Sequence, residues 1–191
     1  ELHKSGLGLV FAEKNEAIVQ DLNTNRGYRI SINGEDEPFV PVEGAVHISK
    51  DETVQGLDGI IQHAHVIITA IGSNNLGDAA SVITKPLSER AKNGNPINVI
   101  ACENMISNSS SLKGMVKSQL ATEEAELIDA KVGFPDCVFD RICASGSGMP
   151  VIERDYKWSV ESGQWKGAHD VPAITYAYGI QPFAITKLYL L

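Results

Sequence analysis

The sequence predicts an α/β domain built on a mainly parallel sheet, with an antiparallel insertion and a β-rich extension. Apolar runs of strand length alternate with segments of helical periodicity between residues 9 and 143. The runs at 66–71 and 97–101 are almost wholly apolar, as strands buried on both faces are. Residues 27–50 instead alternate in polarity. In a fold of this class, ligands bind at the C-terminal ends of the parallel strands.

The spacing of apolar residues predicts the first strands and helices of the chain. Residues 9–12 form a short apolar run that ends in an acid, and Ile18, Val19 and Leu22 then recur at helical spacing. Within the insertion, Asn33-Gly34 is a hairpin signal, and residues 39–40 and 45–46 are expected to supply its partner strands. Residues 57–61 predict a short helix before the buried strand at 66–71.

The second half repeats the alternation. Residues 74–92 have helical spacing, and Pro86 is expected to kink or end that helix. Serines at 107–111 precede a helix expected over 112–120, a further helix is expected from Thr122, and a strand over 131–142. The alternation of strand and helix patterns stops near residue 145, and the sequence after it favours strands. We therefore predict a first domain over 1–144 and a β-rich extension over 145–191 that leads into a helical domain.

The composition and charge of the chain exclude several classes of partner and site. The 191 residues are 43% hydrophobic and 21% charged, which is typical of a globular chain. The formal net charge of −8 argues against nucleic acid as a partner, and no stretch of 18 apolar residues predicts a membrane span. Three cysteines without a C-x-x-C pair predict reduced thiols in a cytoplasmic protein, and the scattered histidines predict no metal site.

Glu13 is the most informative single residue. In a nucleotide-binding α/β unit, an acid at the end of the second strand accepts hydrogen bonds from the adenosine ribose and favours NAD over NADP. A solvated acid after a strand is the alternative. The glycine-rich phosphate loop belongs about 20 residues before the acid, which falls before residue 1, so we expect the chain to begin inside the first helix of such a unit.

Five segments together carry a family resemblance: LVFAEKNEAIVQDL at 9–22, VIITAIG at 66–72, NVIACENM at 98–105, VGFPDCVFDRI at 132–142 and QWKGA at 164–168. In this order they resemble the polyol (mannitol) dehydrogenase family, and most its mannitol-1-phosphate 5-dehydrogenase branch. The resemblance implies a Rossmann-like fold, NAD as the cofactor, and interconversion of mannitol 1-phosphate and fructose 6-phosphate. It also implies that a sugar phosphate is the small-molecule partner.

The resemblance assigns site residues one by one. The positions that it implies for cofactor binding are Glu13, Thr69, Ala70, Gly72, Glu103 and Asn104. Without it, a glycine ends any buried strand, and two polar residues after a strand are a helix entry. Asp136 is implied as a substrate residue, because relatives acting on free polyols usually have Asn there.

Lys187 is implied as the catalytic base. The family's signature continues with Asn five residues later and His three beyond that, which places all three near one helix face. Taken alone, a lysine among apolar residues is a snorkelling surface residue. The alternatives in function are a hexuronate reductase or free-polyol dehydrogenase of the same family, and a catalytically silent dinucleotide-binding module. We expect these 191 residues alone to be inactive.

Overall fold

The computed structural model describes residue 3 and residues 7–32, 35–36, 39–48, 56–140, 143–144, 151–152, 157–160, 166 and 187–190. Its centre is a six-stranded sheet in the order β6-β1-β14-β7-β8-β9, and every neighbouring pair in it is parallel. These strands are β1 (Gly8–Glu13), β6 (Gly44–His47), β7 (Val66–Thr69), β8 (Ile97–Ala101), β9 (Val132–Gly133) and β14 (Lys187–Leu190). The predicted Rossmann-like α/β class is confirmed.

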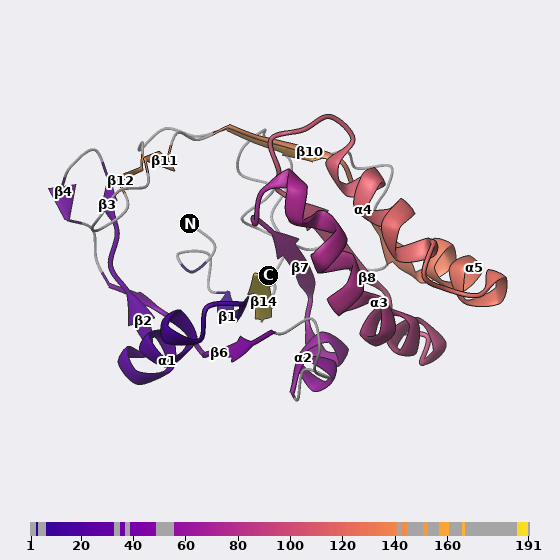
Figure 1. The fold of residues 1–191 in the computed structure, drawn as a ribbon, viewed down its shortest axis with the longest axis horizontal. Helices are drawn as coiled ribbons and strands as arrows, with labels where there is room; N and C mark the ends of the chain where they lie inside the picture. The colour runs from indigo at the N-terminus through magenta and orange to yellow at the C-terminus, as the bar shows by residue number, and fades with distance from the viewer. Residues whose placement is uncertain are drawn as a thin grey trace.

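The chain winds outward from the middle of the sheet in two directions. From β1 it passes through helix α1 (Glu16–Asn25) to β6 at one edge, and from β7 it proceeds to β8 and β9 toward the other edge. β14 fills the central position between β1 and β7 (Figure 1). The winding direction reverses there, and such a reversal leaves a crevice beyond the C-terminal strand ends.

Four helices connect and cover the later strands: α2 (Leu57–His63), α3 (Leu76–Lys92), α4 (Asn108–Lys117) and α5 (Thr122–Lys131). The long helix α3 packs against α2, α4 and α5, and α3, α4 and α5 lie at the right of Figure 1. Ile83 and Leu87 of α3 are fully buried in the same core as Val99 of β8. Of the two apolar runs predicted as buried strands, the second forms β8, which is buried at every position, whereas the first forms β7 only as far as Thr69, and Ala70 after it is exposed.

The insertion after α1 is antiparallel in part. β2 (Gly27–Tyr28) pairs with β5 (Val40–Pro41), and β3 (Ser31–Ile32) pairs with β4 (Glu35–Asp36). The predicted turn at 33–34 lies outside the described residues. The expectation that residues 45–46 belong to this insertion is wrong, because they lie in β6, whose backbone pairs in parallel with β1 and completes the ladder of the main sheet.

Helix α3 continues through Pro86 to Lys92, so the expectation that the helix ends there is wrong, and the kink stays a prediction. A proline inside a helix costs about 3 kcal/mol, and tertiary anchoring of the next turn offsets it. Arg90 is only 7% exposed and donates to the carbonyl oxygens of Ile61, Asn95 (3.3 Å) and Pro96 (2.9 Å). These bonds tie the C-terminal half of α3 to α2 and to the turn before β8.

The strand expected over 131–142 is split. β9 ends at Gly133, and β10 (Cys137–Asp140) pairs antiparallel with β13 (Lys157–Val160). β11 (Cys143–Ala144) pairs with β12 (Val151–Ile152), which also pairs with β3. The boundary at residue 144 stays a prediction, and strands on its two sides pair with each other.

Asn98 is the one polar residue in the apolar run of β8, and it is 4% exposed. Its side chain accepts a hydrogen bond from the Lys166 backbone N–H (2.9 Å) and donates one to the Lys166 carbonyl (3.1 Å). The amide thus binds Lys166 as a neighbouring strand would. This contact joins Lys166 to β8.

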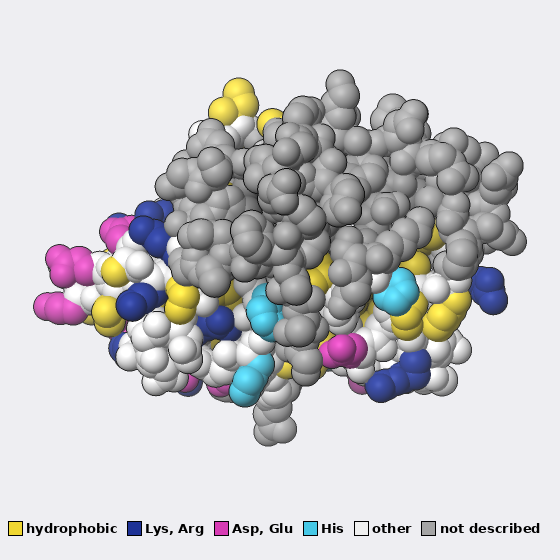
Figure 2. Space-filling model, turned by 180° about the vertical axis from the view of Figure 1, so that it is seen from behind, with side chains coloured by type: hydrophobic (Ala, Val, Ile, Leu, Met, Phe, Trp, Pro, Cys, Tyr) yellow, Lys and Arg dark blue, Asp and Glu magenta, His cyan; other side chains and the backbone are white. Residues whose placement is uncertain are grey.

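The surface shown in Figure 2 has its described lysines and arginines scattered among acidic, histidine and hydrophobic side chains, with no continuous basic stripe. Within the described ranges, no helix has the length and apolar character needed to cross a bilayer. The same ranges hold no group of three or more His, Cys, Asp and Glu side chains arranged to bind a metal ion.

Candidate functional site

A cavity of about 260 Å³ lies beyond the C-terminal ends of β1, β6 and β7. The apolar wall comes from Ile48 just after β6, Ile71 in the turn after β7, and Val82 of α3. The polar lining comes from four residues at the mouth: Glu13, Lys14, Asn75 and Asp78. A largely apolar pocket with a few polar groups, placed next to the reversal of the winding, is typical of a nucleotide-binding crevice.

Glu13 is the last residue of β1 and is half-buried beside this cavity. Its backbone is fixed by the Ile48 N–H, which donates to its carbonyl at 3.0 Å. One carboxylate oxygen, Oε1, accepts the Asn15 N–H at 2.8 Å, and the Asn15 side chain in turn caps α1 through the Ala17 N–H. In the described part of the chain, no protein donor reaches Oε2, which leaves this oxygen available to accept from a ligand hydroxyl.

The turn after β7 forms the next part of the wall, and Glu103 shapes it. Glu103, from the loop after β8, is 8% exposed. Its Oε1 accepts the Thr69 hydroxyl (3.1 Å) and the Ile71 N–H (3.0 Å), and its Oε2 accepts the Gly72 N–H (2.8 Å). Gly72 has φ of 86°, a conformation that a residue with a Cβ rarely adopts. The carboxylate therefore fixes the turn that carries Ala70 and Ile71 into the cavity.

The sequence-predicted cofactor residues fall into two groups. Glu13 and Ala70 line the cavity, whereas the fully buried Thr69 and Gly72 do not line it and are bonded to Glu103. Glu103 reaches the same turn from behind, and both its oxygens are bonded to protein donors. Asn104 is exposed on the following loop. Contact of each residue with a cofactor stays a prediction.

The loop after β8 is held by a buried amide. Asn108, 1% exposed, donates to the carbonyls of Cys137 (2.8 Å) and Glu103 (3.3 Å) and accepts the Cys137 N–H (3.1 Å). Asp136 lies beside it, and its two carboxylate oxygens accept the backbone N–H (2.8 Å) and hydroxyl (2.6 Å) of Ser110. Asp136 therefore stabilises the start of α4, and its contact with substrate stays a prediction.

The expected helical setting of Lys187 is wrong. Residues 187–190 form β14, because an apolar, β-prone segment completes the backbone ladders of both β1 and β7. Lys187 pairs with Gly8, at the start of β1, whereas Glu13 ends that strand. Gly8 and Glu13 are five residue steps apart along β1, which corresponds to about 16 Å. This arrangement puts the Lys187 backbone at the N-terminal end of the parallel strands, whereas the cavity lies at their C-terminal ends.

Two thiols lie under the same loop. The sulfur atoms of Cys102 and Cys137 are 4.0 Å apart, and Cys137 is buried. Hydrogen bonding with Cys137 and burial raise the pKa of the Cys102 thiol far above its ordinary value. Little Cys102 thiolate is therefore present near neutral pH.

We expect the folded protein to protect Cys102 from alkylation. In an assay at about pH 7.5, we expect iodoacetamide to modify Cys102 at least roughly tenfold more slowly in the folded protein than in the urea-unfolded chain. The reason is that only the thiolate reacts, and the folded protein holds little of it. Peptide mass spectrometry after timed quenching gives the rate at this cysteine. Equal rates in the folded and unfolded protein would contradict the raised pKa.

Sequence patterns did not single out Lys14, Asn75, Asp78 or Asn108. Lys14 and Asp78 form an ion pair although 64 positions separate them, so no local spacing reports it. The signal for Asn108 is visible in hindsight, because an asparagine at a helix start is a common capping residue. Here its side chain bonds to a neighbouring strand as well as to the Ser109 N–H.

Comparison with known proteins agrees with this geometry. Residues 1–170 match the family described as the mannitol dehydrogenase Rossmann domain. The chain is similar to a mannitol-1-phosphate 5-dehydrogenase of Oceanobacillus iheyensis, with 31% identity over 196 residues that cover 98% of this chain and 50% of the relative. The chain thus spans about half the length of that curated relative. The parallel sheet, the cavity at its strand ends and these matches show that the chain belongs to the mannitol dehydrogenase family of oxidoreductases.

Proposed function

We propose that this chain supplies the dinucleotide-binding unit of an NAD-dependent dehydrogenase that interconverts mannitol 1-phosphate and fructose 6-phosphate. The observation that carries the proposal is the cavity beyond β1, β6 and β7 with the Glu13 carboxylate at its edge. The 31% identity to a protein named mannitol-1-phosphate 5-dehydrogenase supports the substrate class.

The residues present fit the adenosine half of the cofactor. Ile48, Ile71 and Val82 give apolar surface for a planar base. Glu13 offers Oε2 to the ribose hydroxyls, and Gly72, with its positive φ, follows the two turn residues Ala70 and Ile71 that line the cavity. When bound, the nicotinamide ring exchanges a hydride with the carbinol carbon of the substrate.

A base must take the proton from the substrate hydroxyl, and Lys187 is the proposed base on the family resemblance alone. For Lys187 to reach the cavity edge, residues 187–190 must leave their position between β1 and β7. Asp136 is proposed on the same ground to favour the phosphorylated substrate. Assaying the complete gene product with mannitol 1-phosphate and with mannitol, each with NAD and with NADP, tests substrate and cofactor together.

The adenosine assignment is tested with nucleotides rather than turnover. We expect 5′-AMP to bind the protein and to bind about tenfold more tightly than 2′-deoxy-AMP, because a hydrogen bond to a charged acceptor is worth about 1.5–3 kcal/mol. In Glu13→Gln this discrimination should largely disappear. Isothermal titration calorimetry or ligand-observed NMR gives the dissociation constants.

The matched control is Glu16→Gln, an exposed acid three residues away that bonds only to Gln20 among the described residues. It should keep the wild-type discrimination between the two nucleotides. Failure of the wild-type protein to bind 5′-AMP overturns the proposed function. Equal discrimination in Glu13→Gln and wild type overturns the role of Glu13.

A further inference from the structure

We propose that Asp78 is a specificity-determining residue, which holds the Lys14 ammonium in an ion pair at the cavity mouth and so disfavours a ribose that carries a 2′-phosphate. The inference rests on the proposed function, since it concerns the ribose end of the same cavity. It differs from the role proposed for Glu13, because Asp78 lies on α3 rather than at the end of β1 and acts through Lys14.

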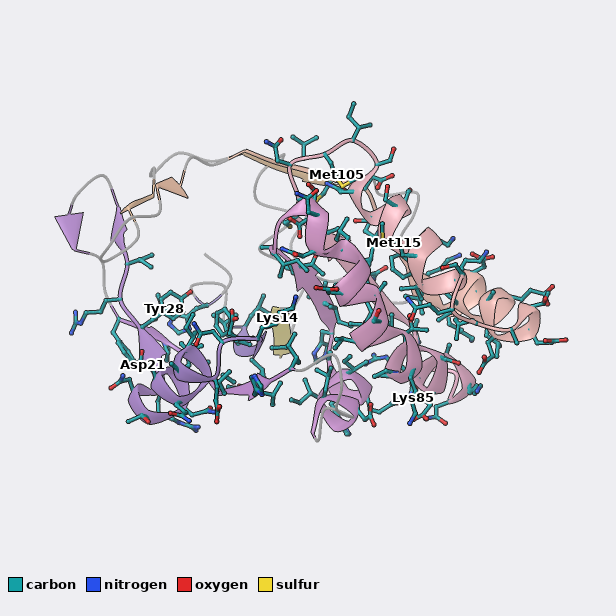
Figure 3. All side chains as sticks on the ribbon, in the orientation of Figure 1. Lys14, Asp21, Tyr28, Lys85, Met105 and Met115 are labelled. Carbon is teal, nitrogen blue, oxygen red and sulfur yellow. The ribbon has the colours of Figure 1, made fainter. Side chains whose placement is uncertain are left out.

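The geometry puts three charges at one mouth. Lys14 immediately follows Glu13 at the end of β1, and its Nζ donates to Oδ2 of Asp78. Asp78 lies in the first turn of α3, and all three residues line the cavity. Figure 3 shows Lys14 between the β1 end and α3, so the pair joins the two walls of the cavity.

The ion pair occupies Lys14, the one lysine or arginine among the described residues that line the cavity. Two carboxylates and one ammonium leave the mouth with an excess negative charge. A phosphate monoester carries about −1.5 to −2 charges at neutral pH. For the 2′-phosphate to bind the Lys14 ammonium, the ion pair between Lys14 and Asp78 must break. The phosphate then lies close to the Asp78 carboxylate, which repels it. An unphosphorylated ribose imposes neither cost, because its hydroxyls can donate to Glu13.

Accessibility favours an electrostatic rather than a packing role for the pair. The Lys14 side chain is 49% exposed and that of Asp78 is 24% exposed. Ion pairs this exposed contribute little to folding, and a long lysine side chain re-orients readily. Neutralising Asp78 therefore releases an ammonium that can pair with a phosphate at the ribose.

The experiment measures the ratio of dissociation constants for 5′-AMP and adenosine 2′,5′-bisphosphate in the full chain, by titration calorimetry at low salt. The variants are Asp78→Asn, Lys14→Met and the double variant, each checked for folding by circular dichroism. We expect Asp78→Asn to shift the ratio about fivefold toward the bisphosphate. Lys14→Met should shift it the other way, and the double variant should lose the gain of Asp78→Asn.

Glu124→Gln is the matched control. Glu124 of α5 is also an acid paired with a lysine, Lys92 of α3, and its neutralisation changes the net charge by the same amount. Glu124 does not line the cavity. The ratio of the two dissociation constants in Glu124→Gln should therefore equal that of wild type. A shift in Asp78→Asn no larger than in Glu124→Gln overturns the inference, as does a gain that persists in the double variant. Absence of 5′-AMP binding in wild type instead overturns the proposed function.

Discussion

Replacing Glu103 by alanine is expected to unfold the turn after β7 and to destabilise the whole domain. The substitution leaves the Thr69 hydroxyl and the N–H groups of Ile71 and Gly72 without their acceptor. A buried donor left unsatisfied costs about 1–3 kcal/mol, so we expect a total loss of about 3–5 kcal/mol. That is a large fraction of the roughly 5–15 kcal/mol that stabilises a typical domain.

Two measurements separate this positioning role from simple loss of packing. The melting temperature should fall by about 10 °C, and the affinity for 5′-AMP should fall at a temperature where the variant is still folded. Glu103→Gln keeps one carbonyl acceptor but directs an amide group at a backbone donor, so it should rescue the affinity only partly.

Thr69→Val provides the internal control for the Glu103 prediction. On its own it removes one donor to the carboxylate, whereas in the Glu103→Ala background no acceptor remains for it to lose. The cost of Thr69→Val should therefore be smaller in that background. Additive costs would contradict the contact between these two side chains.

Much of the element order could be predicted because its signals are local. The strands β7 and β8 are runs of apolar residues in which hydrophobic burial and β-branched side chains favour the same state. Glu13 could be placed at a strand end for the same reason. The parallel arrangement followed from the alternation of strands with helices.

The misses are places where a tertiary contact overrides a local rule. Of the two outcomes expected at Pro86, a kink or a helix end, the helix end does not occur, because the three carbonyl contacts of the buried Arg90 fix the next turn. The segment at 187–190 was assigned to a helix by family resemblance, and the ladders of β1 and β7 instead align it as a strand. Neither outcome is visible in a window of neighbouring residues.

The candidate site shows the same division. Sequence reasoning named residues at the cavity, but it assigned Glu103 to the cofactor without foreseeing that its carboxylate is bonded to the β7 turn, 31 to 34 positions away. The ion pair between Lys14 and Asp78 is likewise a product of the winding that brings β1 next to α3. Long-range polar contacts depend on the fold and cannot be obtained from spacing.

Replacing Asn108 by alanine is expected to cost about 3 kcal/mol, because this single amide satisfies the N–H and carbonyl of Cys137 and the carbonyl of Glu103. All these groups lie in a buried region around a side chain that is 1% exposed. A loss of this size should lower the melting temperature by roughly 6–12 °C. Because Asn108 also positions the backbone of Glu103, the affinity for 5′-AMP should fall as well.

Two further variants make the prediction about Asn108 specific. Asn108→Asp retains an acceptor but cannot donate, so its carboxylate faces two carbonyl oxygens and its pKa should be raised by that repulsion and by burial. Asn108→Asp should then be less stable at neutral pH than near pH 5 relative to wild type, since protonation restores a donor. Asn104→Ala, exposed in the same loop, should change stability by no more than about 0.5 kcal/mol. If Asn108→Ala is as stable as Asn104→Ala in thermal unfolding, then the buried amide does not hold this loop against β10.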